Sequence, residues 1–459
     1  MPTDGHDHER RVAQVAHALA AHRAGVPLSI HKRAVAHQVP KRDDATYRDA
    51  RIDVAALNRI LDIDERAMTC TAEPGVTFRA LVDATLPLGL VPTVVPELAT
   101  ITLGGAVAGC SLESMSFRFG GFHDSCLEYE VVTTRGEVLR CTPDNEHALV
   151  FQMMHGSFGT LGVLTKLKFK LVRAKPFVHV VYETYETLRD YEAAIARRFA
   201  QQDVDFMDGI IHSPRKLVLN LGRFVDDAPY ANRYDWLKVY YRSTAKRRED
   251  YLATKDYFFR YDRGVTNVNP KSFVARLLFG KLVSSATLLR FARKVHRFLP
   301  ARPAVTLDMF IPMSRVEDYF AWHDRELGFY PLWCVPYRRV HDYEWLSDSY
   351  WSKIHDQLFL DLAIYGMKQR EGHDDYREIE EELARVDGIK TLISYNRYEE
   401  DEFWRIWNES NYARVKERTD PDNVLRDVYS KTCRAPLGLP DVPSRFGAAR
   451  ATRDHGGTT

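Results

Sequence analysis

The sequence predicts an α+β protein of two domains, the first of them rich in β-strands. One observation is the segment VLTKLKFKLV at 163–172, in which apolar and polar residues alternate as in a half-buried strand. A second is the stretch from Pro96 to Gly121, which is dense in glycine, serine and threonine. The third is a change of composition after Lys175-Pro176, beyond which aromatic and charged residues become more frequent. A chain of 459 residues is long enough for two domains.

Composition narrows the class of protein. Hydrophobic residues make up 45% of the chain and charged residues 28%, as in ordinary globular proteins. The net charge of +1 argues against nucleic acid as a partner. The six cysteines are scattered without a CxxC pair, so we expect reduced thiols and no metal site. No signal peptide pattern and no apolar run of about 18 residues stands out, which favours a cytoplasmic protein, at most peripheral at a membrane.

Local patterns predict the elements of the first domain in order. Pro27 to Ile30 predicts a strand, and Thr77 is a plausible N-cap for a helix. Expected helices cover 12–24, 77–86 and 145–154, and expected strands cover 27–30, parts of 52–61 and 68–72, 127–134, 138–142 and 163–172, with a turn at 62–65.

In the second part of the chain the expected strands are 180–185, 216–221, 305–312 and 358–365, and 188–200 is an expected helix. The stretch 271–298 carries basic and apolar residues at helical spacing. Two interpretations stay open for it: helices with a solvated charged face, or a surface that rests on anionic lipid. The tail from 437 to 459 is rich in glycine and charge, which predicts disorder.

The stretch from Pro96 to Gly121 is the candidate phosphate site, because closely spaced small residues let backbone N–H groups approach an anion. It lacks the G-x-G-x-x-G spacing between strand and helix of the doubly wound dinucleotide fold. It also lacks the Gly-Lys-Ser/Thr of nucleotide hydrolases. A loop-built phosphate site on an α+β domain remains, as does a simple glycine-rich turn between strands.

The order of these parts resembles the FAD-binding domain of the vanillyl-alcohol-oxidase superfamily, the PCMH type. The resemblance rests on the Pro74-Gly75 turn, Thr102 with the glycines that follow, and Gly159-Thr160-Leu161-Gly162-Val163. It implies two α+β subdomains that clamp FAD, followed by a second α+β substrate (cap) domain. The implied division is 1–175 for the FAD-binding domain, 176–400 for the cap, 401–436 for a C-terminal segment that returns to the FAD-binding domain, and 437–459 for the tail.

Further motifs resemble the Δ24-sterol reductases within that superfamily. They include Pro96-Glu97-Leu98, Asp256 to Gly264, Tyr330-Pro331-Leu332-Trp333 and Glu402-Phe403-Trp404. The resemblance implies a flavoprotein oxidoreductase with NADPH or NADH as electron donor and a hydrophobic substrate. The cofactor-binding residues that we expect are Thr100, Thr102, Leu103, Gly104, Gly105, Gly109, Cys110, Ser111, Glu113, Ser114, Ser116, Gly120, Gly159, Gly162 and Val163.

Reduction of a C=C bond needs a hydride and a proton, so we sought acids and their partners. The candidate catalytic residues are Tyr261, Asp262, Arg263 and Tyr395. The alternative for Asp262-Arg263 is a surface ion pair, and for Tyr395 a strand end packed on the core. Glu113 is expected either in solvent or on the flavin or ribose hydroxyls, because an unpaired buried carboxylate is costly.

The chain also departs from the family pattern. The segment 28–39 contains no glycine where the family has its first phosphate loop, so Lys32 or Arg33 is expected to supply charge there. The membrane-anchoring N-terminal helix of the animal enzymes is not found. His31 and His37 raise covalent flavin attachment, as do Cys110 and Cys126, but exposed histidines and buried thiols are the simpler interpretation, which favours non-covalent FAD.

Three functions follow from these patterns. The first is an FAD enzyme that takes hydride from NADPH and reduces a C=C bond in a sterol-like or isoprenoid side chain. The second is an FAD-dependent oxidase or dehydrogenase of a small alcohol or sugar lactone. The third is a non-catalytic lipid-binding relative, and its support is the glycine-free segment in place of the first phosphate loop. The sequence does not define the oligomeric state.

Overall fold

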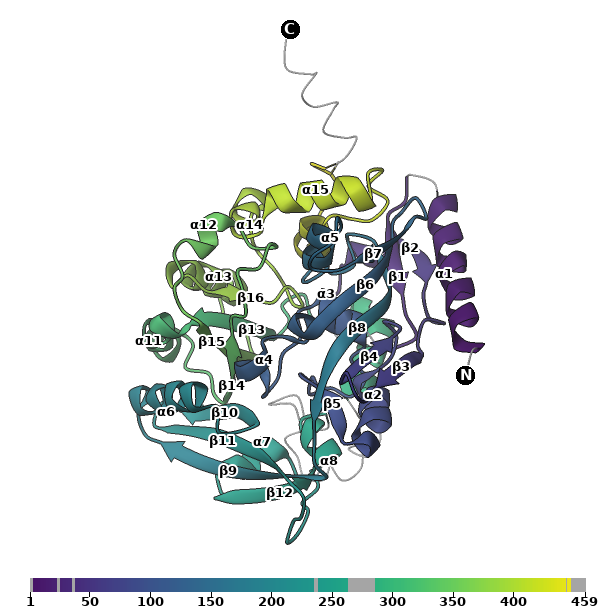
Figure 1. Ribbon diagram of the computed structural model, residues 1–459. Helices are drawn as coiled ribbons and strands as arrows, with labels where there is room; N and C mark the ends of the chain where they lie inside the picture. The colour runs from purple at the N-terminus through teal and green to yellow at the C-terminus, as the bar shows by residue number, and fades with distance from the viewer. Residues whose placement is uncertain are drawn as a thin grey trace.

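The computed structural model describes residues 3–22, 25–34, 38–234, 238–262, 285–442 and 444–446. Two large β-sheets stand side by side, each with its own helices, and the C-terminal helices α14 and α15 lie across one end (Figure 1). The helices are α1 (Thr3–Ala21), α2 (Phe78–Thr85), α3 (Leu103–Ala108), α4 (Ser116–Phe119), α5 (Ala148–Met153), α6 (Leu188–Gln201), α7 (Tyr240–Thr244), α8 (Thr254–Phe258), α10 (Ser285–Lys294), α11 (Val316–Glu326), α12 (Asp348–Trp351), α13 (Asp375–Arg385), α14 (Glu400–Ile406) and α15 (Glu409–Thr419).

The first domain contains a six-stranded sheet in the order β3-β4-β8-β6-β7, with β5 paired to β8. Its strands are β3 (Ile60–Asp64), β4 (Thr69–Ala72), β5 (Leu90–Pro92), β6 (Cys126–Val132), β7 (Val138–Cys141) and β8 (Val163–Arg173). The alternation predicted for 163–172 is confirmed, since Leu167 and Phe169 are fully buried while Lys168 and Lys170 are exposed. The expected turn at 62–65 is wrong, because β3 continues through Asp64 to pair with Thr69.

A small parallel sheet joins the start of the chain to its C-terminal segment. It consists of β1 (Leu28–His31) and β2 (Ala50–Asp53), and Leu28 N–H donates to the Val424 carbonyl at 2.9 Å. Lys416 on α15 forms a buried ion pair with Asp420 at 2.7 Å and donates to the carbonyl of Thr160. Residues 409–425 thus pack on the first domain although they follow the second in sequence.

The second domain, which begins at β9, is an eight-stranded antiparallel sheet in the order β12-β9-β11-β10-β14-β15-β13-β16. The chain passes from one sheet to the other between Arg173 and Phe177. The strands are β9 (Phe177–Tyr185), β10 (Phe206–Ser213), β11 (Lys216–Val225), β12 (Glu249–Ala253), β13 (Val305–Pro312), β14 (Leu332–Arg338), β15 (Leu358–Met367) and β16 (Ile389–Lys390).

The two faces of the eight-stranded sheet differ in chemistry. One face is apolar and is covered by α6, α11 and α13, which lie on the outer side of the sheet (Figure 1). Leu307 and Met309 of β13 and Leu362 of β15 belong to this core. The residues that alternate with them point to the other face, toward the first domain, and include Asp308 and Asp361. That face is the one that positions the site.

The end of the chain departs from the prediction of disorder from 437. Phe446 is buried against Trp404 and Tyr412, with ring centroids 5.0 and 5.1 Å apart. Aromatic packing therefore orders this residue despite its polar neighbours. The part of 271–298 up to residue 284 lies outside the described residues, as does 447–459. Among the described helices, none combines the length and the apolar character needed to cross a bilayer.

Candidate active site

A cavity of about 760 Å³ lies between the two domains. The first domain contributes the Thr102–Leu112 stretch and the turn from Ser157 to Val163. The second domain contributes side chains of β13, β14 and β15, and α10 and the C-terminal segment close the ends. One space is thus bordered by a glycine-rich wall and a polar sheet face, an arrangement suited to a cofactor on one side and a substrate on the other.

We call Gly104, Gly105, Gly109, Gly159 and Gly162 the glycine wall. A Cβ on Gly105 would stand 3.2 Å from the Lys32 amino group and 3.1 Å from the Thr102 hydroxyl, so the missing side chain leaves room for an anion beside the lysine. Of the residues expected to bind the cofactor, those that line the cavity are Thr102, Gly104, Gly105, Gly109, Cys110, Ser111, Gly159, Gly162 and Val163.

Two lysines face the glycine wall. Lys32, just after β1, donates to the Thr102 hydroxyl at 3.1 Å. Lys431 donates to the Phe158 carbonyl at 2.8 Å, next to Gly159. Burial lowers the pKa of each lysine to about 8, and Arg293 adds to the effect at Lys32. A positive charge was expected from Lys32 or Arg33 in the glycine-free segment 28–39. Lys32 lines the cavity, whereas Arg33 is exposed and does not line it.

The opposite wall is acidic. Asp308 of β13 and Asp361 of β15 line the cavity, and we call this pair the acid wall. Tyr365 donates to Asp308 Oδ1 at 2.6 Å, and Met309 N–H donates to Asp361 Oδ1 at 3.0 Å. Burial raises the pKa of both carboxyl groups, and Asp308 raises that of Asp361 further.

Sequence reasoning missed the acid wall, because both strands were interpreted only as core. A signal was present: each apolar strand, VTLDMFIP and LFLDLAIY, carries one aspartate in its middle. A buried carboxylate inside such a strand is costly and indicates either a partner or a function. The cavity-lining residues Trp333, Thr391 and Lys431 were also missed.

Glu113 is not in solvent, and it does not line the cavity. It is buried and forms an ion pair with Arg260 at 2.8 Å, while Ser114 N–H donates to its other oxygen at 2.6 Å. Arg260 also lies 3.1 Å from Asp208 and sits over the rings of Tyr257 and two further tyrosines. The cost of burying Glu113 is thus offset by a cation from the second domain, not by solvent or cofactor.

The other expected cofactor residues lie outside the described cavity lining. Leu103 is fully buried in the core, and Ser116 accepts the Glu113 N–H at 3.0 Å. Ser114 contacts Glu113, and Gly120 ends α4 with φ +75°, where a Cβ would collide with Asp124. Thr100 has intermediate burial and is not a lining residue, although Leu98 and Ile101 on either side of it are. A role in cofactor binding stays a prediction for these residues.

Of the first group of candidate catalytic residues, Tyr261 and Asp262 do not line the cavity. Tyr261 donates to Asp208 at 2.9 Å and lies behind Trp333, with ring centroids 5.1 Å apart. Burial and Asp208 raise the pKa of its hydroxyl well above the ordinary value, which makes it a poor acid. Asp262 accepts the Ala99 N–H and lies 3.9 Å from Arg79. Arg263 lies outside the described residues.

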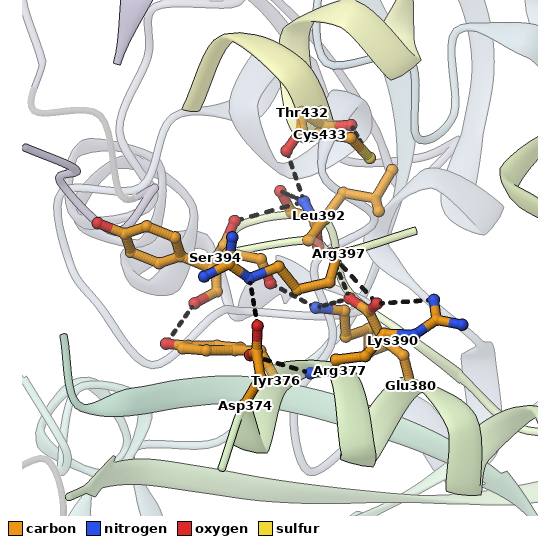
Figure 2. Close-up of polar contacts among 12 residues, drawn as sticks. Asp374, Tyr376, Arg377, Glu380, Lys390, Leu392, Ser394, Arg397, Thr432 and Cys433 are labelled. Carbon is orange, nitrogen blue, oxygen red and sulfur yellow. Dashed lines mark hydrogen bonds and ion pairs between the residues drawn. The ribbon is translucent and has the colours of Figure 1, made fainter. Parts of the chain in front are cut away.

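Tyr395 is held in a polar network beside the cavity. Figure 2 shows Lys390 between Glu380 of α13 and the segment that follows β16, where Arg397 N–H also donates to Glu380. Lys390 donates to the Tyr395 carbonyl, and the Tyr395 ring packs against Tyr376, with centroids 5.5 Å apart. Burial raises the pKa of Tyr395 to about 12. Tyr395 is therefore packed on the core, which was the alternative to a catalytic role. Thr391 and Ile393 of the same segment line the cavity.

The residues considered for covalent attachment have ordinary surroundings. His31 is about half exposed and lies 3.5 Å from Asp53, outside the cavity lining. Burial raises the pKa of the Cys126 thiol to about 12 and that of Cys110 still further, so neither is a ready nucleophile. His37 lies outside the described residues.

Comparison with known proteins agrees with this architecture. Residues 10–142 match the model of an FAD binding domain. The chain is 26% identical over 402 residues to the human Δ24-sterol reductase, covering 82% of this chain and 76% of that protein. It is 25% identical over 476 residues to the Δ24-sterol reductase of Pisum sativum, covering 93% and 84%. A shorter match, 26% over 258 residues, links it to cytokinin dehydrogenase 6 of Oryza sativa subsp. japonica and covers 51% and 47%.

The α+β fold and the matched domain define a flavoprotein with a PCMH-type FAD-binding domain. Within that class the chain is similar to the Δ24-sterol reductases, and this similarity together with the matched domain supports a flavin-dependent oxidoreductase.

Proposed function

We propose that this protein reduces a C=C bond in the side chain of a sterol-like or isoprenoid lipid, with FAD as the cofactor and NADPH as the electron donor. The observation that carries the proposal is the similarity to Δ24-sterol reductases across 82–93% of the chain. It extends through the second domain, which supplies the polar sheet face of the cavity. A hydrophobic lipid is the corresponding substrate class.

The residues of the first domain fit FAD. In our proposal Lys32 and Lys431 hold the pyrophosphate against the glycine wall, because ammonium groups and unobstructed backbone are the partners a pyrophosphate needs. The bound flavin would supply the hydride chemistry, and the protein would supply position and exclusion of water. The pair of lysines also weakens the argument that the glycine-free segment marks a flavin-free protein.

The edge of the cavity suits a lipid. Leu289, Phe291, Ala292 and Val295 of the α10 region line the cavity. Phe291 is nevertheless 64% exposed, and Phe298 is 89% exposed. Arg293 fixes this region by donating to the Gln38 carbonyl at 2.8 Å. In our proposal the exposed rings and neighbouring basic side chains rest on an anionic membrane surface from which the substrate enters.

The same cofactor would serve an oxidase or dehydrogenase of a small alcohol or sugar lactone. The two functions differ in which reaction reoxidises the flavin. An anaerobic stopped-flow experiment would mix the holoenzyme with NADPH or NADH and follow loss of the flavin absorption band. The reduced enzyme would then meet a sterol with an unsaturated side chain, a prenyl lipid or oxygen.

We expect reduction by NADPH and rapid reoxidation by one of the alkenes, with formation of the saturated product. Fast reoxidation by oxygen alone, together with flavin reduction by a polyol, would contradict the proposal and favour the oxidase. A purified protein that binds no flavin would contradict both.

A further inference from the structure

The inference concerns the acid wall and rests on the proposed function. Asp308 and Asp361 are brought together by strand register. In the antiparallel pair β13–β15, Phe310 stands opposite Asp361 and Asp308 stands opposite Ala363. The two aspartates are therefore diagonal neighbours on one face of the sheet, within mutual electrostatic reach.

The hydrogen bonds distinguish the two carboxyl groups. Asp308 receives donors on both oxygens, from Tyr365 at 2.6 Å and from Thr391 at 3.4 Å. Asp361 receives the Met309 N–H on Oδ1, and among the described residues no donor reaches its Oδ2. Because donors stabilise a carboxylate, Asp308 is the better site for the negative charge and Asp361 for the proton.

The surroundings favour one retained proton. Asp361 is 1% exposed, and Glu97 lines the cavity from the first domain. Burial, Asp308 and Glu113 raise the pKa of Glu97 to about 8, although a hydrogen bond to its own backbone and, less strongly, Arg260 oppose the increase. Arg260 itself is engaged by Glu113 and Asp208, so it does not neutralise the acid wall. Ionising every carboxyl group here would place like charges together away from water.

An isolated alkene accepts hydride poorly unless a proton reaches the other carbon of the double bond. We propose that the Asp361 carboxyl group donates this proton from the second-domain side of the cavity, and that Asp308 acts through it as a positioning residue. The O–H bond of Asp361 breaks as one C–H bond forms. The hydride for the other C–H bond would come from the bound, reduced flavin, and Asp361, left as a carboxylate, regains a proton from solvent.

The neighbouring charge then has a second effect. Positive charge that develops on the alkene carbon during protonation faces Asp308 and the carboxylate that Asp361 becomes. Fixed negative charge aimed at developing positive charge is stabilising in a site with little water. The same wall thus donates the proton and stabilises the resulting charge.

The test uses holoenzyme of wild type and of Asp361→Asn, which keeps the size of the side chain. Asp318→Asn is the matched control, because Asp318 is an exposed residue of α11. We expect Asp361→Asn to be reduced by NADPH at the wild-type rate. Its reoxidation by the unsaturated sterol should slow by about 10²–10⁴-fold, the usual contribution of a general acid. Reoxidation within about tenfold of wild type would overturn the inference.

A second readout does not depend on turnover. Infrared spectra of the resting holoenzyme at neutral pH should contain a protonated-carboxyl band that is lost in Asp361→Asn and kept in Asp318→Asn. In Asp308→Asn the band should persist and titrate at lower pH, because the neighbouring charge is gone. A wild-type spectrum without an Asp361-dependent band would also overturn the inference.

The two readouts separate this inference from the proposed function. If wild-type reduced enzyme reacts with no alkene, the proposed function fails, and the proton-donor role fails with it. If wild type reduces the alkene and Asp361→Asn does so equally fast, only the proton-donor role fails.

Discussion

The Arg260 guanidinium of the second domain lies 2.8 Å from the Glu113 carboxylate of the first domain, and both side chains are almost fully buried. Arg260 also lies 3.1 Å from Asp208, so one cation serves two carboxylates at the contact between the domains. Burial of ions is costly, and such a cluster persists only when every charge keeps its partner.

Arg260→Met should therefore destabilise the protein by about 3–5 kcal/mol, because it leaves two buried carboxylates without their cation. Urea unfolding of the holoenzyme measures this change. The double variant with Glu113→Gln should lose less than the sum of the single variants. Arg140→Ala removes an exposed pair with Glu128 and should cost under about 1 kcal/mol. Equal losses for Arg260 and Arg140 would contradict the assigned role.

Lys32→Met and Lys431→Met should each weaken FAD binding about ten- to a hundredfold, since each removes a charge-assisted hydrogen bond to the pyrophosphate. Titration of apoprotein with FAD, followed by flavin fluorescence, gives the dissociation constant. Lys246→Met, at an exposed lysine, is the control. Unchanged affinity in both cavity variants would exclude the pyrophosphate assignment.

The affinity for FAD should also depend on pH. Both lysines have a pKa of about 8 in the empty cavity, and only the protonated form attracts the anion. Affinity is thus expected to be constant below about pH 7 and to fall as the pH rises through 8. An affinity for FAD that stays constant up to pH 9.5 would show that protonation of the two lysines does not contribute to binding.

Helix α1 should be held most firmly in mildly acidic solution. His8 lies 2.8 Å from Glu73 and 3.0 Å from Glu130, and hydrogen bonds to Glu130 and then Glu73 raise its pKa to about 9. The stabilisation is complete below pH 6.5, the ordinary histidine value, and is lost as the pH rises through 9. The pKa shift corresponds to about 3 kcal/mol, and solvent screening of the partly exposed pair reduces this value.

Glu130 responds in the opposite direction. Burial opposes its ionisation, but hydrogen bonds from His8, Thr165 and Lys166 outweigh burial and lower its pKa to about 2. This contribution is lost as the pH falls from 4.5 through 2. Hydrogen exchange of α1 should therefore be slowest between about pH 4.5 and 6.5, after correction for the intrinsic rate. His8→Gln should remove the alkaline limb; exchange in that variant with an unchanged profile would contradict the assignment.

Binding to anionic vesicles tests the lipid surface. Phe291→Ser with Phe298→Ser should reduce vesicle binding strongly, since the apolar contact of an interfacial helix is lost. Sedimentation with phosphatidylserine-containing vesicles measures the bound fraction, and Val138→Ser, at an exposed residue of β7, is the control. Equal binding by the double variant and the control would place the lipid contact elsewhere or exclude it.

Local sequence patterns predicted helices and strands well where the spacing of apolar residues matches the residues that are buried. The strand 163–172 and the Thr77 cap are examples, since alternation and N-capping are local properties. The glycine wall was also accessible, because small residues cluster in sequence there. Lys431 was not, since it reaches Gly159 only after the C-terminal segment folds back on the first domain.

The acid wall illustrates the same limit. Asp308 and Asp361 are separated by more than fifty residues, and only the β13–β15 register places them on one face. The ion pair of Glu113 was not predicted for a related reason, because its partner Arg260 comes from the other domain. Side chains that meet only in the tertiary structure are isolated residues in the sequence. Their role becomes apparent only when both members of the pair are known.

Lys431 has a consequence for how the holoenzyme is made. It is translated after every other described residue that lines the cavity. Domains tend to fold in the order of synthesis, so the glycine wall exists on the ribosome before its second ammonium group arrives. Flavin that binds to a nascent chain contacts the glycine wall and Lys32 without Lys431, and can dissociate again. Secure retention of the cofactor then becomes a property of the finished polypeptide, and flavin content reports whether the last helices have docked.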